Sequence, residues 1–405
     1  TYSGSKSLTF SGAASSAGPV TAPTVTDKDG NAVAFGTTTP ITFTSGVATA
    51  GGSLKLYKAE SATIAVTDGT ISAAVSDRLT VTVSGLAASR LVVSGSGSQT
   101  AGQAQTVTIA AKDTYGNTDT TYTGDKTLTF SGAGDSTNPV VRPTVTDKNS
   151  TKHTFGAATT VNFTAGSASA SMTLYNAETS TVAVTDGSLS AAGSDALSVV
   201  VASAPATRLV VSGPASQTAG QARTISVYAT DPYGNTDPTY VGDKSLTFSG
   251  AASSSSPVTH PTVANKSAVA TNFGTPTTIT FAYGVASRSM KLYAHETALV
   301  AVTDGTLEAA GDDRLSVAVS AASASRLVVT GSASQTAGQA QTVTVTAKDA
   351  YGNTDTTYTG DQSLTFSGAA NSSSPVTHPT VTDKDGNAVA FGSRSEEHTS
   401  ELQSH

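Results

Sequence analysis

The chain has 405 residues, a formal net charge of −7 and no cysteine, and 37% of its residues are hydrophobic. It contains no basic cluster that would neutralise phosphates, which excludes nucleic acid as a partner. The lack of cysteine excludes disulfides, thiolate metal sites and a cysteine nucleophile. No apolar run approaches the ~18 residues of a membrane span, so we expect none in this chain.

A repeat of 118 residues organises the sequence. Arg90, Arg208 and Arg326 are each 118 residues apart, in the motifs SRLVVSG, TRLVVSG and SRLVVTG. We expect a partial repeat at 1–88 without its opening strands, complete repeats at 89–206 and 207–324, and a partial repeat at 325–393 without its closing strands. Because the first copy starts in mid-repeat, we expect the chain to be a fragment, with the secretion signal and the anchor outside it.

The last twelve residues align with no other copy of the repeat. The stretch RSEEHTSELQSH, residues 394–405, resembles the in-frame translation of a widely used DNA sequencing adapter. We therefore interpret 394–405 as an adapter-derived artefact and expect it to be disordered.

Within a complete repeat, apolar residues alternate with small polar residues along short runs, which predicts strands with one buried face. In the first complete repeat these runs are, in chain order, 105–113, 126–132, 160–164, 171–175, 181–187 and 197–203. Turn signals such as GN, DG and AG separate the runs, and no helical pattern appears. About seven to nine antiparallel strands with one apolar face each predict a two-sheet β-sandwich. We expect an additional hairpin at 145–155.

The stretch SQTAGQAQTVTIAAKDTYGNTDTTYTGDKTLTFSG, residues 98–132, resembles the bacterial immunoglobulin-like repeats of invasin/intimin-type adhesins and related large surface proteins. The AGQ turn, the TVT strand, the KD-x-YGN turn and the LTFSG strand carry the resemblance, which extends over the complete and the partial repeats. It implies an all-β chain of tandem immunoglobulin-like antiparallel β-sandwiches in an elongated array. It also implies a place outside the cell or on a bacterial cell surface, and it implies no particular ligand.

The loop KD-x-YGNTD recurs in three repeats and carries two aspartates in each: Asp113 and Asp119, Asp231 and Asp237, Asp349 and Asp355. Carboxylates spaced along a loop at the end of a domain are candidate ligands of Ca²⁺. The alternative is a turn between strands, in which Gly and Asn accept positive φ and Asp bonds its own backbone. Since no full metal-loop spacing is present, we favour the turn and predict no cofactor.

Two further motifs are predicted to be structural. The segment Asp27–Asn31, DKDGN, is interpreted as a hairpin turn because its counterparts DKNST and NKSAV lose one or both of the carboxylates. The tyrosines of YGN and LYNAE are predicted to lay one flank on the core or corner of a sandwich.

The residues favour a structural role. No nucleophile, base and acid recur together, so we predict that the chain is not an enzyme. The leading hypothesis is a stalk or spacer segment of a surface or secreted adhesin, whose partners are its own neighbouring repeats, with any host-cell, glycan or matrix ligand bound outside this segment. The alternative is a set of repeated modules that bind a glycan or a protein by avidity. Loop residues that differ between copies, as in VTAP, VVRP and VTHP, favour the spacer.

Overall fold

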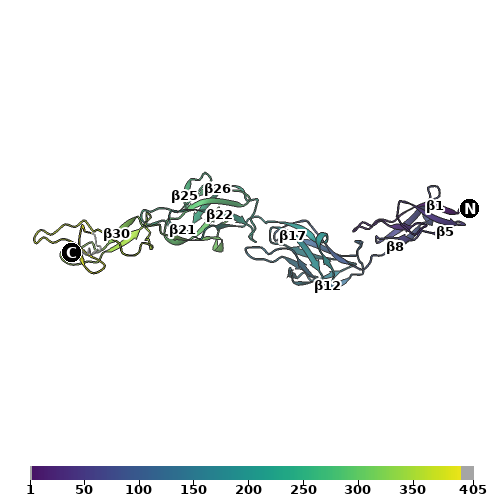
Figure 1. Ribbon diagram of the computed structural model, residues 1–405, viewed down its shortest axis with the longest axis horizontal. Helices are drawn as coiled ribbons and strands as arrows, with labels where there is room; N and C mark the ends of the chain where they lie inside the picture. Colours follow the sequence, from purple (N-terminus) through teal and green to yellow (C-terminus); the bar gives the residue numbers. More distant parts are fainter. Residues whose placement is uncertain (1, 394–405) are drawn as a thin grey trace, which may run out of the picture.

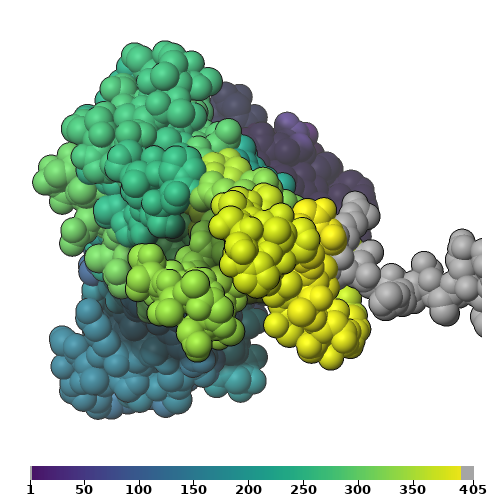
Figure 2. Space-filling view, turned by 90° about the vertical axis from the view of Figure 1, so that its left-hand side faces the viewer, coloured from purple at the N-terminus to yellow at the C-terminus, as the bar shows by residue number. Residues whose placement is uncertain are grey.

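The computed structural model describes residues 2–393, so the predicted adapter-derived tail at 394–405 lies outside the described residues. The described chain is built from strands and three short 3-10 turns. Its repeats follow one another along a single long axis (Figure 1). Viewed along that axis, successive repeats lie on different sides of it, so the array is staggered (Figure 2). Between residues 2 and 393, no helix is long and apolar enough to cross a membrane.

Two sheets face each other in the second repeat. One has the strand order β14-β13-β16-β11-β9, and the other has the order β10-β19-β17-β12-β15, with β18 paired to β17. The strands are β9 (Arg90–Ser94), β10 (Ser98–Thr100), β11 (Ala104–Lys112), β12 (Gly124–Ser131), β13 (Thr144–Thr146), β14 (Lys152–Thr154), β15 (Ala158–Phe163), β16 (Ser167–Thr173), β17 (Thr179–Thr185), β18 (Ser190–Ala191) and β19 (Leu197–Ala202).

The third repeat repeats this topology, with the orders β20-β22-β27-β24-β25 and β21-β29-β28-β23-β26. Its strands are β20 (Arg208–Ser212), β21 (Ser216–Thr218), β22 (Ala222–Thr230), β23 (Gly242–Ser249), β24 (Thr262–Ala264), β25 (Ala270–Asn272), β26 (Thr277–Phe281), β27 (Val285–Lys291), β28 (Glu296–Thr303) and β29 (Leu315–Ser320). The prediction of tandem all-β sandwiches is confirmed.

The period-two alternation decides which side chains enter the core. Val107, Ile109 and Ala111 of β11 are completely buried, and so are Leu128 and Phe130 of β12 on the facing sheet. Burying each large side chain of this kind contributes about 1.5–3 kcal/mol. The intervening threonines and serines lie on the outer faces of the sheets, which explains the low hydrophobic content of the chain.

One strand pair in each sandwich is parallel. The short second strand β10 pairs in parallel with the last strand β19, in the register Gln99↔Val201. In the third repeat β21 pairs with β29 in the same way, with Gln217 opposite Val319. The alternation of apolar residues did not indicate this pairing, because it fixes the face of a strand and not its direction relative to a neighbour.

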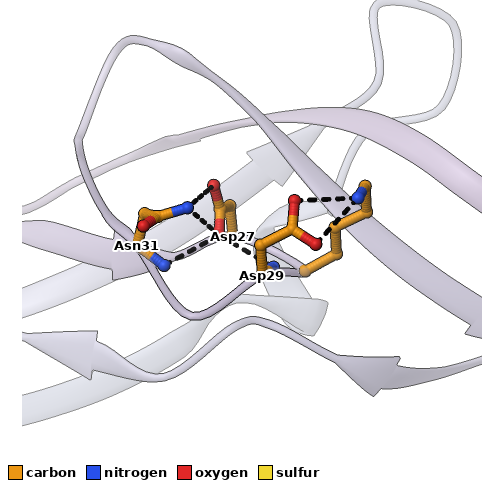
Figure 3. Close-up of polar contacts among 4 residues, drawn as sticks. Asp27, Asp29 and Asn31 are labelled. Atoms are coloured by element: carbon orange, nitrogen blue, oxygen red, sulfur yellow. Dashed lines mark hydrogen bonds and ion pairs between the residues drawn. The ribbon is translucent and has the colours of Figure 1, made fainter.

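The additional hairpin predicted at 145–155 is confirmed, since β13 and β14 pair with Val145 opposite His153. Its counterpart in the first repeat turns at the DKDGN segment, shown in Figure 3. There Oδ1 of Asp27 accepts the backbone N–H groups of Asp29 and Asn31, at 2.9 and 2.8 Å. The carboxylate closes a turn, as predicted.

The first and last repeats form smaller assemblies. The first contains β1 (Gly4–Ser11), β2 (Thr24–Thr26), β3 (Ala32–Ala34), β4 (Thr38–Thr44), β5 (Val47–Ala50), β6 (Leu54–Lys55), β7 (Glu60–Thr67) and β8 (Leu79–Val83), in the orders β5-β4-β1-β7-β8 and β3-β2-β6. The last contains two hairpins, β30 (Arg326–Thr330) with β31 (Thr344–Lys348), and β32 (Thr380–Thr382) with β33 (Ala388–Ala390). Val343 is 37% exposed, whereas Val107 and Ile225 at equivalent places are 0% and 1% exposed. The last repeat therefore lacks a closed core.

Candidate functional site

The YGNTD loops lie where one repeat meets the next, and their aspartates hold the linkers. Oδ2 of Asp113 accepts the backbone N–H of Leu86 at 3.0 Å, and Oδ2 of Asp119 accepts that of Ala88 at 2.8 Å. The same bonds join Ala204 to Asp231, Ala206 to Asp237, Ala322 to Asp349 and Ala324 to Asp355. Each linker thus enters a repeat along a path fixed by two carboxylates.

The loop folds around its first aspartate. Oδ1 of Asp113 accepts the N–H groups of Tyr115 and Asn117, both at 2.8 Å, and Oδ2 also accepts Nδ2 of Asn117 at 2.8 Å. Gly116 completes the turn with a φ of +85°, a conformation that favours glycine. With the linker bond, this fully buried carboxylate accepts four N–H groups, which is how an ionised group remains stable out of water.

The asparagine of the same loop reaches the preceding repeat. Nδ2 of Asn117 donates to the carbonyl of Tyr57 at 2.9 Å, and its Oδ1 accepts the N–H of Ala59 at 2.8 Å. The side-chain amide therefore pairs with the neighbouring backbone as a peptide group would. Asn235 makes the same two bonds to Tyr175 and Ala177, and Asn353 makes them to Tyr293 and His295.

Two tyrosines from neighbouring repeats pack against each other at each junction, with their ring planes inclined by 59–60°. The ring centroids are 5.0 Å apart for Tyr57 and Tyr115, for Tyr175 and Tyr233, and for Tyr293 and Tyr351. Tyr233 also packs against the core of the second repeat, and Tyr351 packs against the core of the third. As predicted, the YGN tyrosines pack against the core of a sandwich. The sandwich that receives the YGN tyrosine, however, is the preceding one.

An arginine joins the junction from its other side. Nη1 of Arg90 donates to the carbonyl of Asp113 at 2.8 Å, and Nη2 donates to that of Gly18 in the preceding repeat at 3.0 Å. Nε lies 3.2 Å from Oδ2 of Asp195, so the guanidinium is also ion-paired within its own repeat. In return, Gly18 donates its own N–H to the carbonyl of Tyr115 at 3.2 Å.

The arginine bond to the preceding repeat recurs at the other two junctions. Arg208 bonds the carbonyl of Asn138 and is ion-paired with Asp313, and Arg326 bonds the carbonyl of Ser256. These arginines are the residues that reveal the repeat in the sequence, and the structure shows why they recur: each fixes one repeat to the loop of the one before it.

Five of the junction carboxylates, those of Asp113, Asp119, Asp237, Asp349 and Asp355, are held in the ionised form. Burial opposes the charge on Asp113, Asp237 and Asp349, but hydrogen bonds from neighbouring amides and hydroxyls outweigh it, and the pKa of each is lowered. For Asp119 and Asp355, the hydrogen bond from the threonine two residues on is the largest cause of the lowered pKa. The junctions therefore depend on carboxylates that stay charged down to acidic pH.

The structure brings the six predicted calcium candidates together in pairs, one pair at each junction. Between residues 2 and 393, no three His, Cys, Asp or Glu side chains gather closely enough to hold a metal ion. The interpretation of these loops as turns, with Ca²⁺ binding as the alternative, stays a prediction to be tested. Sequence reasoning missed the joint role of Tyr and Asn, although both recur at the 118-residue interval beside the aspartates.

No protein-family model matches this sequence, and no curated protein sequence matches it. Among solved structures, the chain is similar to the adhesin InvE of Yersinia pseudotuberculosis, with 18% identity over 57% of this chain and 58% of that chain and a TM-score of 0.23. It is similar to domains 4–9 of the surface layer protein SbsC, with 17% identity over 80% of this chain and 48% of that chain and a TM-score of 0.20. A beta-glycosidase from Bacteroides vulgatus matches with 14% identity over 57% of this chain and 25% of that chain, with a TM-score of 0.23.

The chain thus covers about half of the length of the two surface proteins it matches. At TM-scores of 0.20 to 0.23, these similarities support no conclusion about function. The geometry of the junctions remains the basis for a proposal.

Proposed function

We propose that this chain is a rigid spacer segment of a bacterial cell-surface or secreted adhesin-like protein, without enzymatic activity. One observation carries the proposal: the same junction occurs three times along the chain, with equivalent contacts from equivalent residues. A flexible tether would not need a buried carboxylate, an asparagine bridge and a tyrosine pair at every linker.

The geometry of a junction supports stiffness. The linker backbone is hydrogen-bonded at two points, and the YGN loop contacts the preceding repeat through both a side-chain amide and an aromatic ring. Because one loop holds both the linker and the preceding repeat, a change in the angle between the two repeats strains these contacts. The length of such an array increases with the number of repeats. Each repeat adds roughly 30 Å, the length of strands of ~8–10 residues at ~3.3 Å per residue.

The cell-surface location rests on the resemblance of the AGQ, KD-x-YGN and LTFSG motifs to those of adhesin repeats. The alternative of repeated ligand-binding modules has weaker support. Positions 22, 142, 260 and 378 are equivalent loop positions of the four repeats, and they hold Ala, Arg, His and His. A ligand site used in every copy would require the same chemistry at each.

Distance measurement by double electron–electron resonance tests the spacer directly. Because the chain has no native cysteine, spin labels attach only to introduced ones. Spin labels at Ser188→Cys and Thr306→Cys occupy equivalent exposed positions in the second and third repeats. We expect one narrow distance distribution that broadens in the Asn235→Ala variant. A distribution that is already broad in the unmodified junction, and that this substitution leaves unchanged, would reject the spacer.

A further inference from the structure

The relative direction of the second and last strands of each complete repeat bears on how the chain responds to tension. β10 and β19 are parallel, and β19 leads directly to the linker of the next repeat. Val200 donates its N–H to the carbonyl of Gly97 at 2.9 Å, and Ala101 donates to that of Ala202 at 2.8 Å. In the third repeat, Ala318 donates to Ala215 at 2.9 Å and Ala219 donates to Ser320 at 2.8 Å.

Both strands of this pair run from the preceding repeat towards the following one. β9 begins at the junction with the first repeat, where Arg90 bonds Gly18, and continues into β10. At the far end Gly102, just after β10, lies against Tyr233 of the next repeat. A pull on the two ends of the chain therefore draws β10 and β19 in opposite directions along their common axis. The hydrogen bonds between them are loaded together, whereas strands pulled apart from one end break their bonds one at a time.

The inward face of the pair is protected from water. Gln99, Ala101 and Val201 are 8%, 1% and 3% exposed, and Gln217, Ala219 and Val319 are 4%, 5% and 2% exposed. On the outer face Val200 is 55% exposed and Gly97 and Ala202 are exposed, so the resistance of the pair comes from loading its hydrogen bonds together and not from their burial. In the described chain, this pair is also the only strand pairing that joins the opening strands of a repeat directly to its last strand.

From this geometry we propose that the parallel pairs β10–β19 and β21–β29 are mechanical clamps, which make each complete repeat resist unfolding under axial tension. The proposal rests on the spacer function proposed above and adds load-bearing to it. Forced unfolding is governed by the unfolding rate, so the bonds that must break first under load set the resistance.

One difference between the repeats makes the two clamps unequal. In the second repeat, Nε2 of Gln105 donates to Oε1 of Gln99 at 3.0 Å, and Nε2 of Gln99 donates to the carbonyl of Met172 at 3.3 Å. These bonds connect β10 to β11 and β16 of the facing sheet. In the third repeat, Arg223 replaces Gln105, and neither side-chain nitrogen nor oxygen of Gln217 has a hydrogen-bond partner within the described residues. We infer that the third repeat has the weaker clamp.

The turn after β10 offers a substitution that removes one clamp bond with little distortion. Gln103 donates its N–H to the carbonyl of Thr100 at 3.0 Å, and Gly102 follows Ala101 with a φ of +78°. This is the pattern of a type II turn, in which proline is favoured at the position of Ala101. Ala101→Pro therefore fits the turn and removes the N–H that bonds Ala202. Ala219→Pro does the same in the third repeat.

The last repeat contains a matched control. Gln339 donates to the carbonyl of Thr336 at 3.0 Å and Gly338 has a φ of +78°, so Ala337 occupies the same turn. No strand of the described residues pairs with 334–336. Ala337→Pro thus introduces the same ring where there is no clamp bond to remove.

Single-molecule pulling of the whole chain by its two ends tests the proposal. We expect two unfolding events of roughly 400 Å each, from about 115 residues at ~3.5 Å per residue, with the third repeat unfolding at the lower force. Ala101→Pro and Ala219→Pro should each raise the unfolding rate of one event about tenfold at constant force, as the loss of one backbone hydrogen bond implies. Ala337→Pro should change neither event. Arg223→Gln should slow the unfolding of the third repeat by providing a partner for Gln217.

A second comparison separates the clamp from ordinary stability. Val161→Ala removes core volume from β15, a strand outside the clamp. It should lower equilibrium stability at least as much as Ala101→Pro, yet accelerate forced unfolding less. Equal unfolding forces for wild type, Ala101→Pro and Ala219→Pro would overturn the proposal. A larger decrease in unfolding force for Val161→Ala than for Ala101→Pro would also overturn it. A broad distance distribution with intact clamps would contradict the spacer and leave load-bearing in place, so the two failures are distinguishable.

Discussion

Tyr233 of the third repeat lies directly on Gly102 of the second. A Cβ atom added to Gly102 would lie 2.2 Å from the hydroxyl oxygen of Tyr233, and Tyr351 stands in the same relation to Gly220 at 2.1 Å. Glycine is thus required at this position for two reasons, the close approach of a ring from the next repeat and a φ of +78°.

Gly102→Ala and Gly338→Ala separate these two reasons. Both glycines have a φ of +78°, but nothing lies within 4 Å of a Cβ added to Gly338. Each substitution introduces backbone strain of about 1–2 kcal/mol, and only Gly102→Ala displaces a tyrosine. We expect only Gly102→Ala to broaden the distance distribution between labels at 188 and 306. Similar broadening in both variants would show that turn strain, rather than the tyrosine contact, sets the orientation of the repeats.

Asp231→Asn should loosen the junction between the second and third repeats. The substitution can keep the acceptor for Tyr233 and Asn235, but it places an amide N–H₂ opposite the N–H of Ala204. Losing a hydrogen bond to a charged group costs about 1.5–3 kcal/mol, measurable by urea unfolding.

The control for that variant is Asp147→Asn. Asp147 closes the additional hairpin of the second repeat, and Asn265 does so in the third, where Oδ1 accepts the N–H groups of Ser267 and Val269. Because Asn already serves in that turn, we expect a change within about 0.5 kcal/mol. A loss for Asp147→Asn as large as that for Asp231→Asn would contradict a special role of the junction.

Acid should weaken the junctions. The pKa values of Asp113, Asp237 and Asp349 are lowered in the folded chain, so their contribution to stability is complete above the unfolded pKa of about 3.9 and is lost as the pH falls towards the folded values. We expect a constant melting temperature between pH 7 and about pH 5, followed by a decrease below about pH 4. Asp237→Asn should reduce the size of this decrease. A melting temperature that already falls between pH 7 and 5 would point to groups other than these carboxylates.

Removal of calcium should have little effect. At Asp113 the carboxylate accepts four N–H groups, so a cation would have to displace donors that point at the same oxygens. We expect equal melting temperatures in EDTA and in millimolar Ca²⁺. A marked decrease in EDTA that Ca²⁺ reverses would establish the alternative assignment of the six aspartates.

Limited proteolysis should cut the partial repeats before the complete ones. Leu327 and Val329 of β30 are 44% and 57% exposed, whereas Leu209 and Val211 at equivalent positions of β20 are 0% and 4% exposed. Local opening is easiest where few apolar contacts hold the chain, so we expect a resistant product near 89–324, identified by mass spectrometry. Survival of 325–393 as a protected fragment would show that the predicted domain limits are misplaced.

Several features followed from the sequence through local rules. The alternation in 105–113 placed Val107 and Ile109 on the buried face, because successive side chains of a strand point to opposite sides of the sheet. The extra hairpin and the DKDGN turn followed equally from residues close together in the chain. The 118-residue spacing of Arg90, Arg208 and Arg326 marked the repeat, and hence its tandem architecture.

Only the tertiary structure decided the partners. Asn235 bonds Tyr175 across 60 residues of sequence, and Tyr233 packs on the core of a different repeat. The sequence pattern shows that Asn and Tyr recur, but it cannot distinguish a side chain that closes its own turn from one that reaches the neighbouring repeat. The parallel pairing of β10 with β19 was likewise invisible. Alternation fixes which face of a strand is buried, whereas its partner and its direction are selected by the packing of the whole sandwich and by the repeats on either side.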